Sequence, residues 1–325
     1  MRISPVISED MVILDMAPIS PLHGSFPGQR GPEELLQSGL LVLDKPRGPT
    51  SHQVVAWVRD IRGVSKTGHS GTLDPNVSGV LTIGVGDGTR YLDALLAGPK
   101  EYIAVLELSH SVNKKIIRET VAEFTGRIYQ FPPKEAAVVR RLRKRTIYFS
   151  NILEITGKRV LFHVGCESGT YIRTLCSDLG RAMGVKGHMA ALRRGKTAQF
   201  HEGQAVTLHD LKDAVYYYRE EDNEEELMKI LRPPEEVLSL YPSIIIKDSA
   251  VDAICHGAPL TVPGIAALDP RIRKSKIVAI LSLKGEGVAL ARSKLHAKNA
   301  PGMKRGVAAV STRVLMRPGT YPKGW

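Results

Sequence analysis

The stretch Lys66-Thr-Gly-His-Ser-Gly-Thr-Leu-Asp-Pro-Asn-Val-Ser-Gly-Val-Leu81 consists largely of small residues and leads into an apolar segment, 81–85, that predicts a β-strand. The residues before it place apolar side chains on one face of a predicted helix, with Ser51 as its N-terminal cap and Gly63 at its end. A loop held between a helix and a strand is a common position for binding and catalysis. Residues 66–81 are therefore the first candidates for a functional site.

Short strands and amphipathic helices alternate after this loop. In the predicted strand 101–108, Tyr102 shares a face with the apolar residues two, four and six positions later, so it is expected to point inward. A second predicted strand, 160–166, leads into a helix whose first turn holds Arg173. Because each element is closed by Gly or Pro, the pattern indicates a mixed α+β fold.

The chain of 325 residues is long enough for a large domain and a smaller one. Residues 1–39, rich in Pro, Gly and Ser, are predicted to be an N-terminal extension that packs on another domain or stays loose, and no chemistry is assigned to it. The larger domain is predicted over 40–236, and the acidic run 220–226 marks its boundary region. Residues 241–317 alternate β-rich segments with Gly and Pro, which predicts a small β-barrel.

The charge balance points to a polyanionic partner. Lys and Arg total 45 against 33 Asp and Glu, a formal net charge of +12, and nucleic acid is the first candidate. No apolar run of about 18 residues is long enough for a membrane span. The N-terminal residues include Glu9, Asp10 and Asp15 rather than a basic start and an apolar block, so no secretory signal is expected and the location is predicted to be cytoplasmic.

Cysteine and histidine usage argues against a metal or a disulfide framework. The three cysteines, Cys166, Cys176 and Cys255, are scattered and form no C-x-x-C pair. The ten histidines form no H-E-x-x-H motif and no cluster with cysteine. We therefore predict no metal site and no cofactor.

A strongly basic run follows the pair Pro132-Pro133. The two prolines favour a projecting loop, and no acidic partner is evident nearby in the sequence. We expect contact with RNA phosphates, with a solvated helix face as the alternative. The residues concerned are Arg140, Arg141, Arg143, Lys144 and Arg145.

The motif Gly68-His-Ser-Gly-Thr-Leu-Asp-Pro75, followed by Gly79-Val-Leu81, closely resembles the catalytic signature of TruB-type pseudouridine synthases. The region 241–317 resembles a PUA domain through 257–264 and 284–289. Four further segments resemble the TruB family in the same order: Leu43-Asp-Lys-Pro46 with Gly48-Pro-Thr-Ser51, Lys100-Glu-Tyr102, Gly169-Thr-Tyr-Ile-Arg173, and His188-Met189 with Leu192-Arg-Arg194.

Within the family, Pro132-Pro133 and the Leu192-Arg-Arg194 segment are similar to the archaeal and eukaryotic dyskerin branch. The sequence stops at Trp325 without a Lys-rich tail, which favours an archaeal, H/ACA-type member. One departure follows Arg194: the family often shows a Ser-Gly pair where this chain has Gly195-Lys-Thr-Ala-Gln-Phe200, and the contacts of that predicted loop stay open.

The resemblance implies a fold, an activity and partners. The fold would be a pseudouridine synthase domain with a mixed, mainly antiparallel central sheet, joined to a PUA barrel. The activity would be the isomerisation of uridine to pseudouridine without a cofactor, in the T-loop of tRNA, in rRNA sites guided by H/ACA RNA, or in both. The implied protein partners are the small core proteins of the H/ACA ribonucleoprotein, namely one that docks near the active site, one of the Gly/Arg-rich family and a kink-turn binder.

The resemblance also assigns three catalytic residues. Asp74 would be the nucleophile, and a carboxylate suits attack on the sugar or stabilisation of a glycal route. Arg173 would pair with Asp74, and Tyr102 would stack on the uracil near the C2′ proton. Without the resemblance, an Asp before Pro is a turn residue, Arg173 is a surface arginine and Tyr102 is a core tyrosine.

Three further residues are expected to bind the substrate. A stacked target base must flip out, and His69 would fill or brace the vacated stack. Leu192 would form an apolar wall against the flipped base, with a core role as the alternative. Lys45 is a third candidate for substrate binding, although Lys45 and Pro46 look more structural than catalytic.

Two other classes of protein would explain part of the sequence. A non-catalytic RNA-binding scaffold explains the charge and the PUA-like region, but it does not explain the combination of Asp74, Tyr102 and Arg173. A tRNA transglycosylase-like enzyme also uses an Asp nucleophile, yet it would be expected to show zinc ligands and a TIM-barrel alternation of strands and helices, and neither is visible.

Overall fold

The structure is a computed structural model that describes residues 6–63, 66–133, 139 and 141–323. The contacts between its residues group the chain into two compact units. We call residues 41–83 and 95–223 the central unit. The terminal unit comprises 1–40, 84–94 and 224–325.

The central unit is built on a nine-stranded sheet in the order β2-β4-β9-β5-β8-β7-β6, with β3 on β4 and β10 on β9. Strands β4 and β9 are parallel, whereas β9, β5, β8, β7 and β6 pair antiparallel in turn. The sheet is therefore mixed and mainly antiparallel, as predicted. The strands are β2 (Ser38–Lys45), β3 (Thr67–Ser70), β4 (Ser78–Gly86), β5 (Lys100–Leu108), β6 (Gly126–Gln130), β7 (Arg143–Thr156), β8 (Arg159–Cys166), β9 (Gly187–Thr197) and β10 (Phe200–His201).

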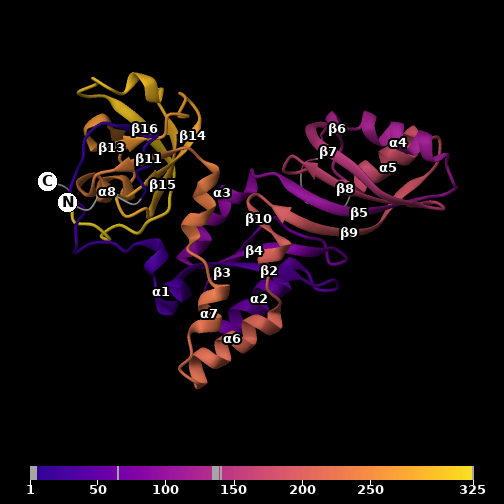
Figure 1. The fold of residues 1–325 in the computed structure, drawn as a ribbon, viewed down its shortest axis with the longest axis horizontal. Coiled ribbons are helices and arrows are strands. Elements are labelled where there is room, and N and C mark those ends of the chain that lie inside the picture. Colours follow the sequence, from indigo (N-terminus) through magenta and orange to yellow (C-terminus); the bar gives the residue numbers. More distant parts are fainter. Residues whose placement is uncertain (1–5, 64–65, 134–138, 140, 324–325) are drawn as a thin grey trace. The chain divides into compact units, whose positions relative to one another are not determined.

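Helices α4 (Lys114–Glu123) and α5 (Ile172–Ala182) cover one face of the strands around β5 and β8 (Figure 1). The core between them contains the fully buried Ala104, Leu106 and Leu108 of β5, as the alternation in the sequence predicted. Tyr102, which precedes these residues on the same face of β5, packs against this core and is half-buried. The other helices of the chain before residue 224 are α1 (Pro32–Gln37), α2 (Ser51–Arg62), α3 (Leu92–Leu96) and α6 (Leu208–Glu220).

The start of α2 differs from the prediction. Thr50, not Ser51, is the N-terminal cap, because its extended backbone lets its side chain accept a hydrogen bond from the amide of Gln53. Ser51 is instead buried, and its hydroxyl bonds both the amide and the carbonyl of Leu73, at 2.9 Å each. Gly63 ends the helix in the left-handed conformation, with φ of 63°.

The segment 195–200 was expected to be a loop, and this is wrong. Strand β9 continues to Thr197, and β10 begins at Phe200 opposite it. Ala198, with φ of 55°, lies in the turn between the two strands. The departure from the family pattern therefore falls at the end of a strand and in a tight hairpin turn.

The terminal unit contains a seven-stranded sheet in the order β1-β13-β11-β14-β15-β16-β12. The region predicted to be β-rich, 241–317, does contain six of these strands, and it also contains a helix at 248–255. The elements are β1 (Val12–Ile13), α7 (Glu225–Ile230), β11 (Ser243–Ile246), α8 (Asp248–Cys255), β12 (Leu260–Thr261), β13 (Ile265–Leu268), β14 (Ile277–Leu281), β15 (Gly287–Ser293) and β16 (Val307–Val314).

The N-terminal extension is part of this sheet's fold. Strand β1 pairs antiparallel with β13, and Val6, Ile7 and Met11 pack against the buried Ile245 and its neighbours. Of the two expectations for residues 1–39, packing on another part of the chain is therefore the one that the described residues show.

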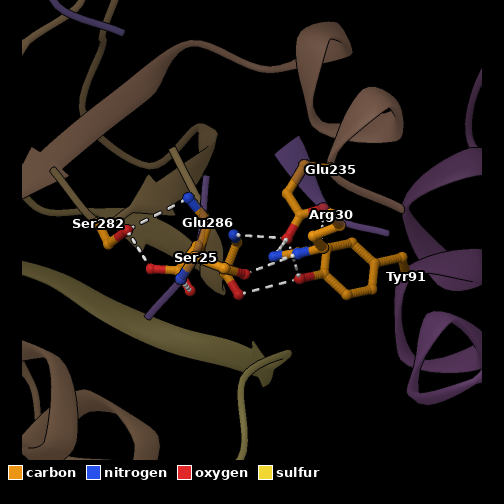
Figure 2. Close-up of polar contacts among 7 residues, drawn as sticks. Ser25, Arg30, Tyr91, Glu235, Ser282 and Glu286 are labelled. Carbon is orange, nitrogen blue, oxygen red and sulfur yellow. Dashed lines mark hydrogen bonds and ion pairs between the residues drawn. The ribbon is translucent and has the colours of Figure 1, made fainter. Parts of the chain in front are cut away.

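A buried polar network joins four segments of the terminal unit (Figure 2). Arg30 makes two hydrogen bonds to the carboxylate of Glu235, at 2.9 and 3.0 Å, and the hydroxyl of Tyr91 lies 3.2 Å from the same carboxylate. Glu286 accepts hydrogen bonds from the amide of Ser25 and the hydroxyl of Ser282. The chain before α1 is thus held by charged side chains as well as by strand pairing.

Candidate functional site

A pocket of about 540 Å³ lies in the central unit beside the turn that follows β3. Most of its wall comes from that turn, from the start of β5, from the loop and first turn of α5, and from β9. The residues that matter for its chemistry are Gly71, Leu73, Asp74, Lys100, Tyr102, Ser168, Arg173, Met189, Leu192 and Arg194.

Asp74 lies on the turn between β3 and β4 and is ion-paired with Arg173. The carbonyl of Asp74 accepts the amide of Val77 at 3.0 Å, so the residue does form a turn, as its position before Pro75 suggests. Its carboxylate Oδ2 accepts a hydrogen bond from Nη2 of Arg173. The two side chains are 55 % and 44 % exposed, so a macromolecular substrate can reach them.

Arg173 is the second residue of α5, at the N-terminal end of that helix. The guanidinium orients the carboxylate, and the positive end of the helix dipole favours its negative charge. The ion pair is the contact that the resemblance implied, and the catalytic role of Arg173 stays a prediction.

Tyr102 lines the pocket and also packs against the buried core of the central unit. Burial raises the pKa of its hydroxyl, and the positive charge of Arg194 acts in the opposite direction. The core-tyrosine alternative fits this packing, and the role of Tyr102 toward a substrate stays a prediction.

From the sequence, Arg194 was noted only as part of the Leu192-Arg-Arg194 segment. In the structure it lies in the wall of the pocket. It is 2 % exposed, and its Nε donates to the carbonyl of Val80 at 2.8 Å. Its Nη2 donates to the carbonyl of Gly71 at 3.0 Å. The adjacent Arg193 lies outside the pocket and makes two hydrogen bonds to Asp44, at 2.9 and 3.0 Å.

Lys100 is a second buried cation of the pocket wall. It is 6 % exposed, and its ammonium donates to the carbonyls of Gly98 at 2.7 Å and Leu96 at 2.9 Å, with the hydroxyl of Ser168 at 3.3 Å. Burial lowers the pKa of this ammonium to about 8. From the sequence, Lys100 was noted only in the Lys100-Glu-Tyr102 segment at the start of a strand. That position does not predict these contacts.

Lys45, expected to bind substrate, is fully buried beneath the turn that carries Asp74. Its ammonium donates to the carbonyls of Pro46 at 2.7 Å and Val77 at 2.9 Å, with that of Pro75 at 3.4 Å. These contacts fix the shape of the turn and correspond to the structural alternative. A direct contact with substrate stays a prediction.

Leu192 and His69 have different surroundings. Leu192 lines the pocket on β9, together with Met189, which had been noted only as part of a family segment and given no role. His69 lies on β3 against His52, with their rings 5.1 Å apart in an edge-to-face arrangement. Burial lowers the pKa of His69, and in the described residues it does not belong to the pocket wall.

The basic run is only partly a loop. Arg140 lies outside the described residues, and strand β7 already begins at Arg143, where it pairs with Gln130 of β6. Arg145 donates to the carbonyl of Gly169 at 2.9 Å and lies 3.9 Å from Glu167. The expectation that the run has no acidic partner is therefore wrong at Arg145, because strand pairing turns its side chain toward the loop before α5.

No group of three or more His, Cys, Asp or Glu residues is placed to hold a metal ion in the described part of the chain. Among the helices of these same residues, none has the length and apolar character needed to cross a membrane.

Four family profiles match consecutive parts of the sequence. The N-terminal domain of TruB family pseudouridylate synthase matches 59–172, and the C-terminal domain of tRNA pseudouridylate synthase B matches 173–239. A PUA domain matches 242–315, and a DKCLD (NUC011) domain matches 8–55.

Curated relatives match nearly the whole chain. A probable tRNA pseudouridine synthase B of Methanopyrus kandleri is 50% identical over 305 residues, which cover 94% of this chain and 90% of the relative. The protein of the same description from Methanosarcina barkeri is 48% identical over 306 residues, with the same coverage.

Solved structures are similar over the same length. A chain of a Cbf5-Nop10-Gar1 complex matches with a TM-score of 0.90 and 43% identity, covering 99% of this chain and 98% of that one. A chain of an H/ACA ribonucleoprotein bound to a substrate RNA containing 2′-deoxyuridine matches with a TM-score of 0.89 and 42% identity, covering 100% of both.

Proposed function

The chain belongs to the TruB family of pseudouridine synthases, and we propose that it isomerises uridine to pseudouridine in RNA at the pocket formed by Asp74, Tyr102 and Arg173. The observation that carries this assignment is the ion pair between Asp74 and Arg173 at a pocket whose wall also contains Tyr102. Three residues from a turn, a strand and a helix converge there, as the family motifs implied.

The reaction needs a group that acts on the sugar. The bond between N1 and C1′ breaks, the uracil turns, and a new bond forms between C5 and C1′ while the proton on C5 is lost and N1 regains one. Asp74 can form a bond to C1′ as uracil leaves and be displaced when C5 attacks, or it can stabilise a glycal route. Neither route requires a metal or a redox cofactor.

The neighbouring residues support this chemistry in different ways. Arg173 keeps the carboxylate of Asp74 ionised and aimed. Tyr102 stacks on the flipped uracil, with its hydroxyl near the C2′ proton that a glycal route removes. Leu192 forms the apolar wall opposite the base, and the binding of the nucleotide in this pocket offsets a flipping cost of a few kcal/mol.

The RNA substrates follow from the relatives. The curated relatives are named for tRNA, and the similar solved chains belong to H/ACA complexes with Nop10, Gar1 or substrate RNA. We propose that this chain modifies the T-loop uridine of tRNA and also works with H/ACA guide RNA on rRNA, together with counterparts of Nop10 and Gar1. The PUA region 242–315 would anchor the guide RNA, and a cytoplasmic location fits these substrates.

Asp74→Asn tests the assignment. The change keeps the size of the side chain but removes its nucleophilic charge, so pseudouridine formation on bound RNA should be abolished while RNA affinity stays within about two- to three-fold. Single-turnover release of tritium from uridine labelled at C5 measures the rate, with a tRNA transcript and with an assembled guide complex as substrates.

Asp178→Asn is the matched control, because Asp178 lies on α5 outside the pocket wall and is near Arg181, at 3.7 Å. Its rate should equal that of the unaltered protein. A rate for Asp74→Asn comparable to that of Asp178→Asn would remove Asp74 from the mechanism.

A further inference from the structure

One side chain connects both ends of the catalytic turn to Tyr102. The guanidinium of Arg194 donates from Nε to Val80 and from Nη2 to Gly71, which lie on either side of Asp74 in the sequence. It also lies directly opposite Tyr102 in the strand pairing, in the wall of the same pocket. Burial raises the pKa of the Tyr102 hydroxyl, and the positive charge of Arg194 favours the ionised form of that group and so acts to lower its pKa. Arg194 itself is almost fully buried in the wall of the pocket.

The strand register places Arg194 in this position. Tyr102 of β5 is directly opposite Arg194 of β9, whereas Glu101 is opposite Lys196, so the pairing shifts by one residue at this point. Such a bulge changes which side chains of a strand face the neighbouring residue. Arg194 is brought beside Tyr102 by this irregularity and not by simple alternation.

On its other side, β9 approaches β4 closely. Gly79 pairs with Arg194, and a Cβ added to Gly79 would lie 2.2 Å from the carbonyl oxygen of Arg194. The φ of Gly79 is 107°, a conformation that favours glycine. The glycine therefore allows the strand carrying Arg194 to lie directly against the strand that follows Asp74.

The chemistry of the contact is directional. A guanidinium can only donate hydrogen bonds, so in a hydrogen bond between the two side chains the oxygen of Tyr102 is the acceptor. The proton of Tyr102 must then point away from Arg194, and Tyr102 lines the pocket. Donation by a charged group also polarises the phenol and strengthens its own donated hydrogen bond.

The burial of Arg194 is otherwise costly. Its acceptors at Val80 and Gly71 are two backbone carbonyls, both uncharged, and a buried cation without a counter-charge destabilises a fold. Arg193, one residue earlier, has the ordinary arrangement, in which Asp44 and Glu202 neutralise its charge. A role in the reaction would explain why a positive charge is buried beside Tyr102 despite this cost.

We propose that Arg194 is a positioning residue for pseudouridine formation, which fixes the hydroxyl of Tyr102 relative to Asp74 and directs its proton toward the bound nucleotide. The inference rests on the proposed function and adds a residue to it. Because Arg194 acts through Tyr102, it contributes to the rate on bound RNA and not to RNA affinity.

A double-mutant cycle tests this coupling. Arg194→Gln should lower the single-turnover rate at least about ten-fold in the unaltered protein and less than about three-fold in the Tyr102→Phe background, because the hydroxyl through which Arg194 acts is already gone. The dissociation constant for RNA should change less than about two-fold in both. Arg193→Gln is the matched control, and its rate should stay within about two-fold of the unaltered protein.

Equal losses from Arg194→Gln in the two backgrounds, or an equal loss from Arg193→Gln, would overturn the inference. Absence of pseudouridine from the unaltered protein would instead overturn the proposed function. If thermal unfolding shows that Arg194→Gln does not fold, Arg194→Lys is put through the same cycle. It keeps the charge but not the planar fork of donors, and its loss should again depend on the hydroxyl of Tyr102.

Discussion

Arg193 and Arg194 follow one another in the chain, yet their surroundings are opposite. Arg193 is in a surface network with Asp44 and Glu202, and Arg194 is buried beneath the catalytic turn. Neighbouring residues of a strand point to opposite faces, so one of the two had to face the pocket. The sequence could not say which, because the shift in register between β5 and β9 decides it.

Tyr102 combines two functions that substitution can separate. Tyr102→Phe keeps the ring that stacks on uracil but removes the hydroxyl, so we expect a fall in rate of about 10²-fold with little change in RNA affinity. Tyr102→Ala should also weaken binding, since stacking contributes about 1 to 3 kcal/mol per base. Single-turnover rates and RNA titrations measure the two effects. Equal, near-normal rates for both variants would show that Tyr102 serves only the core.

At the scale of elements, the sequence predicted what local periodicity controls. The alternating apolar residues of β5 and β8 and the helix holding Arg173 are where the pattern placed them. Contacts between distant segments were not predictable, because they depend on which elements become neighbours. Ser51 is the clearest case: its place at the start of α2 suggested a cap, while its hydroxyl in fact bonds Leu73, 22 residues later.

Ser51 and its neighbour Thr50 provide a matched pair of changes. Thr50→Ala removes the cap of α2 and should cost about 1 kcal/mol of unfolding free energy without slowing catalysis. Ser51→Ala leaves the buried amide and carbonyl of Leu73 without their partner, which should cost about 1 to 3 kcal/mol and also lower the rate, because Leu73 precedes Asp74. Urea unfolding and single-turnover assays measure both. If the two variants had the same rate, the link between α2 and the turn would have no catalytic role.

At the scale of the whole molecule, the terminal unit is assembled from distant parts of the sequence. Strand β1 extends the sheet at β13, and Arg30, Tyr91 and Glu235 meet in one network with Glu286 nearby (Figure 2). The composition of residues 1–39 could not reveal this, since the partners lie more than 200 residues away. Removing the chain from Tyr241 onward would therefore also leave the apolar residues of the extension without their packing partners.

Substitutions in the basic run test whether its side chains bind RNA phosphates. Arg141 and Lys144 are exposed, whereas Arg145 bonds Gly169 and lies near Glu167. Each phosphate contact contributes about 0.7 to 0.9 to the slope of log affinity against log salt. We therefore expect Arg141→Ala and Lys144→Ala each to lower that slope by about this amount, while Arg145→Ala should leave it nearly unchanged and mainly reduce stability.

Filter-binding titrations over a range of salt concentrations measure the slope, and thermal unfolding separates the effect on stability. The rate on RNA that is already bound should change little in all three variants, because none of these side chains lies in the pocket wall. Unchanged slopes for Arg141→Ala and Lys144→Ala would show that the run is a solvated surface. A slope lowered as much by Arg145→Ala as by the other two would mean that its contacts with Gly169 and Glu167 give way when RNA binds.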